Sequence, residues 1–429
     1  MNIPEKLADF YASSPMREGI LCWYPFEAGK RVIDLTRGAL TDLFARLGLV
    51  ECQDAADYIV VLDPADFNVE ALHALRARLN PHGRLLLAYE NPFGLRYFSG
   101  KRSPHADKPF TSFTGADSWP SMAAVKTRLT RAGFVGQKWY YPLTDHWFAT
   151  EIYSDAALPN EFLNQRFIPY VYNEGTLLFD EQPLYREVVR NGAFPFMCGA
   201  YLVEARMTAA DAPCPADYIA ITANREPANR FATVLSNDGM VRKTPLCPEG
   251  LPRAQQLYRN HQELAALGIN VVKTQFEGDT LTMERLHHPV LCDYWAAKLA
   301  DGTFDEAEMF AQFDTIRGLI YKAARNGKCY WEMVPANCFY DEANNDFIFF
   351  DQEYAWDDIT PDAAVARAIG AVKYAKAVQA DPRAKGWLKT LQKRYKLTSR
   401  WEEMTEYLVK TYYEVYGQDA KALYTAAKV

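Results

Sequence analysis

Three polar residues in the last third of the chain have the types and the spacing that phosphoryl transfer requires. Glu332 is followed five residues later by Asn337, and Asp351 comes directly after an apolar run. A carboxylate, an Asn five residues on and an Asp at the end of an apolar strand are, in that order, the base and the magnesium ligands of a kinase. Kinases carry Asp where this chain has Glu332, so we predict Glu332 as an altered base.

The residues between Asn337 and Asp351 would position both predicted metal ligands. Residues 338–340 and 347–350 read as two short strands joined through a polar turn at 341–346. Such a hairpin would direct Asn337 and Asp351 toward one point, where both could bind Mg2+. Taken singly, an Asn or an Asp beside a hairpin is also an ordinary turn residue. The prediction therefore depends on the joint spacing.

A β-rich segment further upstream carries the residues that would bind the nucleotide. It contains three short predicted strands, residues 218–222, 231–235 and 240–246. Lys243 lies on the third strand, where a kinase has the Lys that binds the α- and β-phosphates. From a predicted helix at 252–267, Glu263 would orient Lys243, and Glu284 would belong to a hinge at 283–286 that holds adenine. The alternative for Glu263 and Glu284 is a solvated surface position.

The remainder of this half indicates a two-lobed fold. Residues 224–230, between the first two strands, contain no glycine, so the backbone is not expected to wrap around phosphates. Beyond the hinge the predicted elements are helices, at residues 291–299, 306–326, 361–378, 384–395 and 401–416. A small β-rich lobe (217–284) followed by a larger helical lobe (290–429) is the order of an α+β protein-kinase-like fold.

The first half alternates predicted strands and helices, the pattern of a parallel α/β sheet. The predicted strands are residues 31–35, 57–62, 84–88, 136–141, 147–153 and 200–206, of which 136–141 and 147–153 form an antiparallel pair. The predicted helices are residues 38–47, 69–79 and a segment from Asp117 or Ser118 to Ala132. Gly38, in the turn after the first strand, is the candidate cofactor-binding residue, with Glu51 or Asp54 as the acid that binds ribose. The alternative is that Gly38 merely ends a strand.

Composition sets the broad class of the protein. A length of 429 residues favours two domains, which we place at 1–207 and 217–429 with an Ala- and Pro-rich linker at 208–216. The net charge of -7 offers no basic footprint for nucleic acid, and eight scattered cysteines without metal spacing indicate reduced thiols. The sequence shows neither an apolar leader nor a membrane-spanning stretch, so we expect a cytoplasmic protein that is not an integral membrane protein.

Three segments of the first half carry a resemblance to a known family. They are residues 17–26 (REGILCWYPF), 90–97 (ENPFGLRY) and 150–159 (TEIYSDAALP). Over residues 15–207 the chain resembles class I S-adenosylmethionine-dependent methyltransferases associated with bacterial surface-polysaccharide gene clusters. The resemblance implies a Rossmann-like sheet and S-adenosylmethionine bound near Gly38. Because the glycine-rich loop is shortened and the second and third strands look deleted, we expect a reduced sheet and an inactive methyltransferase half.

The second half resembles the kinase-like domain that follows such methyltransferases, as in the bifunctional methyltransferase-kinases that cap O-antigen chains. The resemblance implies ATP, Mg2+ and a glycan or glycolipid hydroxyl as acceptor, with Lys243, Asn337 and Asp351 as the binding residues. We therefore expect a protein of surface-polysaccharide biosynthesis. One alternative is a non-catalytic scaffold that docks or regulates polysaccharide assembly enzymes. A second is an active S-adenosylmethionine-dependent methyltransferase.

Overall fold

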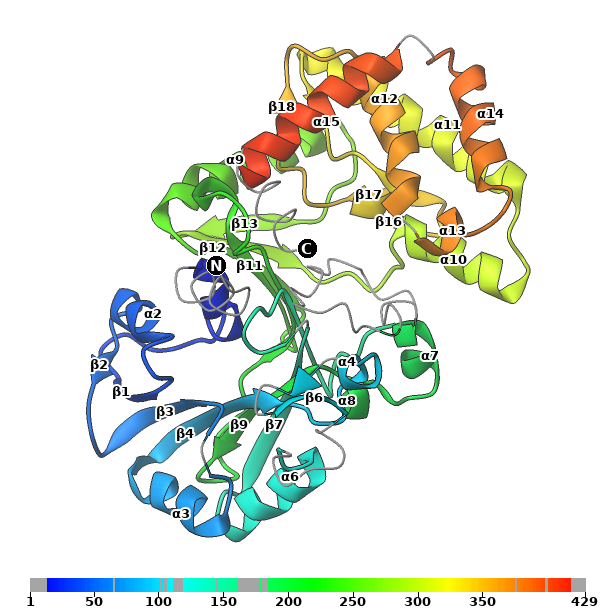
Figure 1. The fold of residues 1–429 in the computed structure, drawn as a ribbon. Helices are drawn as coiled ribbons and strands as arrows, with labels where there is room; N and C mark the ends of the chain where they lie inside the picture. Colours follow the sequence, from blue (N-terminus) through cyan, green and yellow to red (C-terminus); the bar gives the residue numbers. More distant parts are fainter. Residues whose placement is uncertain are drawn as a thin grey trace. The chain divides into compact units, whose positions relative to one another are not determined.

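The structure, a computed structural model, forms two compact units (Figure 1). It describes residues 14–64, 66–100, 102–103, 106–110, 119–143, 145–160, 178, 184–374, 376–397 and 400–417. The first unit holds the described residues up to Asn224 together with Arg230–Asp238, and the second holds Arg225–Asn229 and the described residues from Gly239 onward. The expected boundary at 208–216 differs from this division, because the strands on either side of Asn224 pair with the sheet of the first unit.

The first unit is built on one mixed sheet whose strands follow the order β11-β10-β8-β7-β9-β4-β3-β1-β2. Four neighbouring strands are parallel: β1 (Arg31–Leu35), β2 (Val50–Glu51), β3 (Ala56–Leu62) and β4 (Leu79–Glu90). The strands that continue the sheet beyond β4 pair antiparallel: β9 (Ala200–Arg206), β7 (Gly136–Leu143), β8 (Glu151–Ser154), β10 (Ala216–Ile221) and β11 (Phe231–Ser236). The expected mixed α/β architecture is confirmed at this level.

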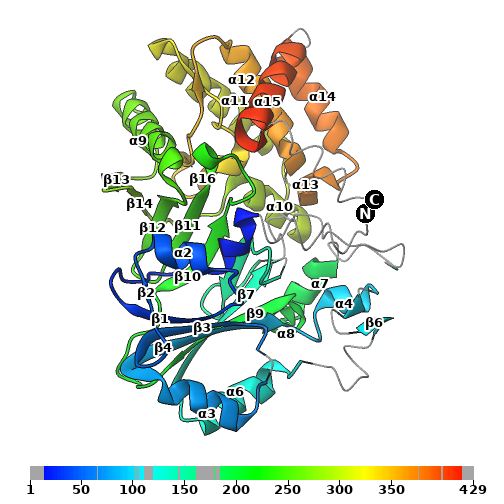
Figure 2. The same ribbon diagram turned by 60° about the vertical axis from the view of Figure 1, so that its left-hand side comes forward.

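Helices cover both faces of this sheet. In the two views of Figures 1 and 2, α3 (Val69–Ala77) and α6 (Met122–Arg131) lie on one face, and α2 (Thr41–Arg46) lies on the other. The expected start of α6 at Asp117 or Ser118 lies outside the described residues, and the observed helix follows a Ser121 cap that accepts from the Ala124 N–H at 3.3 Å. Short helices fill the remaining connections: α4 (Leu95–Phe98), α7 (Tyr185–Arg190) and α8 (Phe194–Met197).

The first unit has one strand that is shorter than expected and one short edge strand that the sequence did not predict. The strand expected at 147–153 begins only at Glu151, because the Asp145 carboxylate accepts the Trp147 and Phe148 N–H groups at 2.8 and 2.9 Å and holds the chain in a turn. The strand after the first helix, β2, has only two residues, Val50 and Glu51, and both are exposed. The sheet therefore ends at this edge in a short, exposed strand.

The second unit starts with three antiparallel strands, in the order β13 (Thr274–Glu277), β14 (Thr280–Glu284) and β12 (Met240–Pro245). Helix α9 (Leu251–Ala266) packs on them through Leu257, which joins a buried cluster with Leu281 and Met283. One hairpin follows in the larger part, β16 (Cys338–Asp341) with β17 (Asp346–Phe349), and the strands on either side of it, β15 (Cys329–Tyr330) and β18 (Ala355–Trp356), form a second antiparallel pair.

Helices make up most of the rest of the second unit. They are α10 (Leu291–Asp301), α11 (Glu306–Ala323), α12 (Pro361–Gly370), α13 (Lys376–Gln379), α14 (Ala384–Arg394) and α15 (Trp401–Tyr416). The single helix expected at 361–378 is divided, since a 3-10 turn at Ala371–Tyr374 follows Gly370. Among the described residues, none of the helices combines the length and the apolar character needed to cross a membrane.

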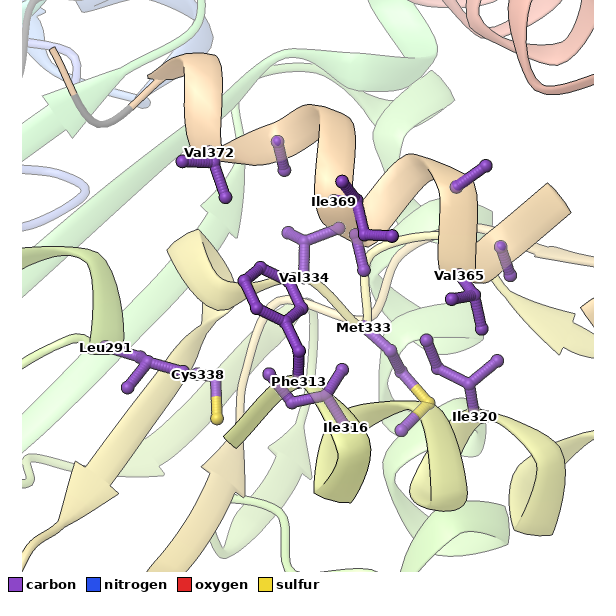
Figure 3. Packing of buried hydrophobic residues seen from close by; sticks show 14 of the residues in the cluster. Leu291, Phe313, Ile316, Ile320, Met333, Val334, Cys338, Val365, Ile369 and Val372 are labelled. Carbon is purple, nitrogen blue, oxygen red and sulfur yellow. The ribbon is translucent and has the colours of Figure 1, made fainter. Parts of the chain in front are cut away.

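The core of the second unit lies between α11 and α12 (Figure 3). Side chains of α11 face side chains of α12, and the chain just after Glu332 lies between them. The labelled residues that meet there are Phe313, Ile316, Ile320, Met333, Val334, Val365 and Ile369, each at most 2% exposed. Because Met333 and Val334 are buried in this core, the backbone that carries Glu332 and Asn337 is fixed by apolar packing.

Removing the side chain of Ile369 tests this core. Ile369→Ala leaves a cavity at a position that is 0% exposed, so we expect the free energy of unfolding of the second unit to fall by roughly 2–5 kcal/mol. Val409→Ala, at a position 48% exposed on α15, is the control and should stay within about 0.5 kcal/mol. Urea unfolding followed by tryptophan fluorescence measures both, and equal losses would contradict the assigned core.

Candidate functional site

A buried lysine joins residues that are more than a hundred positions apart in the sequence. Lys243, on β12, is 6% exposed, and its ammonium group donates to the carboxylates of Asp351 and Glu353. Burial by itself would lower the pKa of Lys243, but these two carboxylates outweigh it and raise the pKa above its usual value. Lys243 is therefore a fixed positive charge at neutral pH.

The hairpin of β16 and β17 positions Asp351 beside Asn337. The Phe350 N–H donates to the Asn337 carbonyl at 3.0 Å, which ties the two ends of the hairpin together. The Phe349 carbonyl accepts from the Val272 N–H at 3.0 Å, which attaches the hairpin to the loop after α9. Asp351 has a φ of 58°, so the chain bends sharply away after the strand. The observed hairpin thus closes on itself at the level of the predicted metal ligands.

Glu332 lies in the same cluster and is held from two sides. Its Oε2 atom accepts from Asn337 Nδ2 at 3.0 Å, and its Oε1 atom accepts from the Arg367 guanidinium at 3.5 Å. Burial raises the pKa of Glu332, the nearby charge of Arg367 lowers it, and the charges of Asp351 and Glu353 raise it, with a net upward shift. The direction suits a proton acceptor, since a general base works best with a pKa near the operating pH.

The donor set at this position suits magnesium better than a metal held by protein alone. Among the residues that the structure describes, no three His, Cys, Asp or Glu side chains form a ready-made metal site. Mg2+ is usually bound by one or two protein groups together with substrate phosphates and water. Asp351 is partly exposed. The side-chain nitrogen of Asn337 donates to Glu332, so the side-chain oxygen, Oδ1, is the Asn337 atom that could bind a cation. These residues fit Mg2+ bound jointly with a nucleotide.

The structure places Glu263 away from Lys243. The Glu263 carboxylate accepts from Lys328 Nζ at 2.8 and 2.9 Å and from the Tyr330 hydroxyl at 2.7 Å. The buried face of α9 instead carries Asn260 and His261, which join Ala254, Leu257 and Leu264 at spacings of three and four residues, and Glu263 is only half-buried beside that face. The carboxylate expected on Lys243 is supplied by the chain after β17.

Helix α9 contacts the segment Asp351–Glu353 through the amide of Asn260. Asn260 Nδ2 donates to the Gln352 carbonyl at 2.7 Å, and Gln352 Nε2 donates to the Glu332 carbonyl at 2.8 Å. His261 is fully buried, and burial lowers its pKa to about 4, with the charge of Lys243 acting in the same direction and that of Asp351 opposing it. His261 is therefore neutral at physiological pH, and the hydrogen bonds of Gln352 link α9 to the backbone of Glu332.

Glu284 ends β14 at the expected hinge, and its side chain is at the surface. Its carboxylate lies 3.5 Å from the Lys273 ammonium, and both side chains are well exposed. The neighbouring Met283 belongs to an apolar cluster that includes Val241, two residues before Lys243, and Phe339, two residues after Asn337. Apolar side chains on both sides of a hinge are the surroundings that an adenine ring needs.

Sequence reasoning missed two residues of this cluster, Glu353 and Arg367. The position of Glu353, two residues after Asp351, was the available signal, because a second acid close to a metal-binding Asp is a candidate partner for the phosphate-binding lysine. Arg367 lies on α12, 35 residues after Glu332. It gave no local signal, and only the packing of α12 brings it to Glu332.

Among the described residues of the first unit, the predicted turn at Gly38 is occupied by local contacts. Gly38 has a φ of 84° in the turn after β1, but the Asp34 carboxylate is used by that turn, where it accepts from Thr36 and Thr41 at 2.6–2.8 Å. Glu51, a candidate for the ribose, lies on the two-residue strand β2. The exposed Arg37 reaches the Asp63 carbonyl at 3.5 Å at the carboxyl edge of β1 and β3. We therefore assign no methyl-transfer step to Gly38.

Two glutamate variants compare the stability that the buried Lys243 site and the more exposed Glu263–Lys328 pair each contribute. Glu353→Gln removes a carboxylate from a buried ammonium, so we expect the free energy of unfolding of the second unit to fall by roughly 2–4 kcal/mol. Glu263→Gln removes a partner from a pair with both side chains about one-third exposed, and should cost less than about 1 kcal/mol. Urea unfolding measures the difference, and a larger loss for Glu263→Gln would contradict the assigned partners of Lys243.

No protein-family model matches this chain, and no curated protein matches it. The family resemblance of both halves therefore stays a prediction, and the functional argument depends on the Lys243 cluster.

Proposed function

We propose that the second unit is a kinase-like domain that binds ATP with Mg2+ and transfers the terminal phosphate to a hydroxyl group. The observation that carries this proposal is the pairing of Lys243 with Asp351, next to Glu332 and Asn337. Phosphoryl transfer depends mainly on positioning and on charge stabilisation, so a few fixed groups of these types suffice. A lysine buried against two carboxylates has the rigidity that this task requires.

Each residue has a role in the proposed reaction. Lys243 would bind the phosphates, and Asn337 with Asp351 would hold Mg2+, which supplies positive charge to the transferring phosphate. Glu332 would accept the hydroxyl proton while the acceptor oxygen forms its bond to the terminal phosphorus and ADP leaves. Arg367 and Asn337 orient the Glu332 carboxylate during this step.

The acceptor in this proposal is a hydroxyl of a glycan or glycolipid, and the pathway is surface-polysaccharide assembly in bacteria. The resemblance of both halves of the chain supports this part. The first unit then has no methyl-transfer role, in line with the misfit around Gly38. It would serve the second unit as a binding module for the polysaccharide or for assembly enzymes.

Asp351→Asn tests the metal-dependent part of nucleotide binding. Calorimetry should show that the natural protein binds ATP with Mg2+, and that Asp351→Asn weakens this binding at least about tenfold, the effect of losing one charged contact. Without Mg2+, Asp351→Asn should bind ATP as well as or better than the natural protein, because Lys243 loses a competing carboxylate. Glu263→Gln is the control, with unchanged affinity. A natural protein that does not bind ATP would overturn the proposal.

The second candidate function is a non-catalytic scaffold, favoured by the contacts of Glu332. Its carboxylate is held by Asn337 and Arg367, and it is one methylene longer than the Asp of a kinase. A displacement of ~1 Å at a reacting group can cost about 10²-fold in rate. A protein with these features could bind nucleotide and still serve only to dock assembly enzymes.

Variants of Glu332 distinguish the enzyme from the scaffold. If Glu332 is the base, Glu332→Gln should lower phosphate release from ATP, with water as acceptor, by about 10²–10⁴-fold and leave the affinity for ATP within a few-fold. Glu332→Asp should retain activity. If phosphate release appears only in Glu332→Asp, the natural protein is the scaffold, because restoring the shorter carboxylate then creates the activity.

A further inference from the structure

The loop of the β10–β11 hairpin, residues Arg225–Asn229, is held by hydrogen bonds to the end of helix α15. Residues Arg225–Asn229 belong to the second unit. The Glu226 N–H donates to the Val415 carbonyl at 2.8 Å, and Asn229 Nδ2 donates to the Glu414 carbonyl at 2.9 Å. The Tyr354 hydroxyl donates to Asn229 Oδ1 at 2.9 Å, just after Glu353 in the sequence. Both α15 and the chain just after Glu353 therefore fix the conformation of residues 225–229.

Part of the backbone of this segment is occupied by contacts that a glycine-rich loop would leave open. In such loops, successive backbone N–H groups point at the phosphates. Here the Glu226 N–H is used on Val415, the Asn229 N–H donates to the Glu226 carbonyl at 2.8 Å, and Pro227 has no N–H. A short 3-10 helix at Pro227–Asn229 fixes this arrangement. With these backbone groups occupied, a side chain of the segment is the better candidate for a phosphate contact.

Arg225 is a positively charged side chain of this segment, four residues before Asn229, which contacts Tyr354 next to Glu353. It is half-buried, and its guanidinium carbon lies 5.9 Å from the centre of the Tyr416 ring. Burial alone would lower the pKa of Arg225, but the charges of Glu353 and Asp351 are among the causes that raise it overall. The same two carboxylates hold Lys243. Arg225 is thus a second cation in the field of the carboxylates that bind the phosphate-binding lysine.

We propose that Arg225 binds the β- and γ-phosphates of the nucleotide and so replaces the backbone contacts of a glycine-rich loop. This inference rests on the proposed function of the second unit. Lys243 is shared between two carboxylates, so a bound triphosphate with Mg2+ still carries negative charge for a second cation to offset. An arginine can donate two parallel hydrogen bonds to phosphate oxygens, and Tyr416 limits the freedom of its side chain.

The test compares ligands that differ only in their phosphates. Calorimetry is done with ATP and ADP in the presence of Mg2+ and with adenosine, on the full chain and on Arg225→Gln. The Arg225→Gln variant should bind ATP about 10–100-fold more weakly, the usual effect of losing a charge-assisted contact, and should bind adenosine within about twofold of the natural protein. Arg225→Lys should fall between the two, because it keeps the charge and loses the paired donors.

The control is Arg259→Gln, which removes an exposed arginine of α9 that donates to Gln256 at 2.9 Å. Its ATP affinity should not change. Equal ATP affinity of the natural protein and Arg225→Gln would overturn the inference and leave the proposed function standing. An equal loss of ATP and adenosine binding would overturn it as well, since that indicates a general structural effect. A natural protein that does not bind ATP would fail both proposals. If Arg225→Gln does not fold, Arg225→Lys alone decides, and unchanged affinity for ATP overturns the inference.

Discussion

The second unit depends on one buried positive charge. Lys243 is taken out of water on β12, and a buried ammonium is tolerated only where carboxylates compensate it. Asp351 and Glu353 supply that compensation from a single short stretch of chain. Strand β12 and the hairpin of β16 and β17 must therefore be held at a fixed position relative to each other. Two hydrogen bonds maintain that position: the Phe349 carbonyl accepts from the loop after α9, and Asn260 donates to the Gln352 carbonyl.

Apolar packing fixes the other side of the same cluster. Met333 and Val334 are buried between α11 and α12, so the adjacent Glu332 has little freedom in its backbone (Figure 3). Helix α12 also carries Arg367, whose guanidinium reaches Glu332. The same helix thus positions Glu332 twice, once through the core and once through an ion pair. A change in the packing of α12 would therefore disturb both the core contact beside Glu332 and its ion pair with Arg367.

Much of the fold could be predicted from the sequence, because the elements have clear local signals. β1, β9 and α15 begin and end where the apolar pattern and the flanking polar residues indicated. The hairpin of β16 and β17 was also visible in the sequence. Glu263 shows where such reasoning ends: its place on α9 was clear, but the direction of its side chain depends on which face of α9 is buried. Arg367 became visible only through the tertiary packing that brings α12 to Glu332.

The cluster is also hard to explain by stability alone. A buried set of charges is often no more stabilising than apolar side chains of the same size would be, because each charge loses its hydration. Lys243, Asp351 and Glu353 nevertheless meet inside the second unit, with Glu332 and Arg367 beside them. The first unit also buries charged groups, since the fully buried Arg96 pairs with Glu90 and Asp145. The cluster of the second unit differs in that its Asp351 side chain is one-third exposed, and this partial exposure supports the site that we propose there for phosphates and a metal ion.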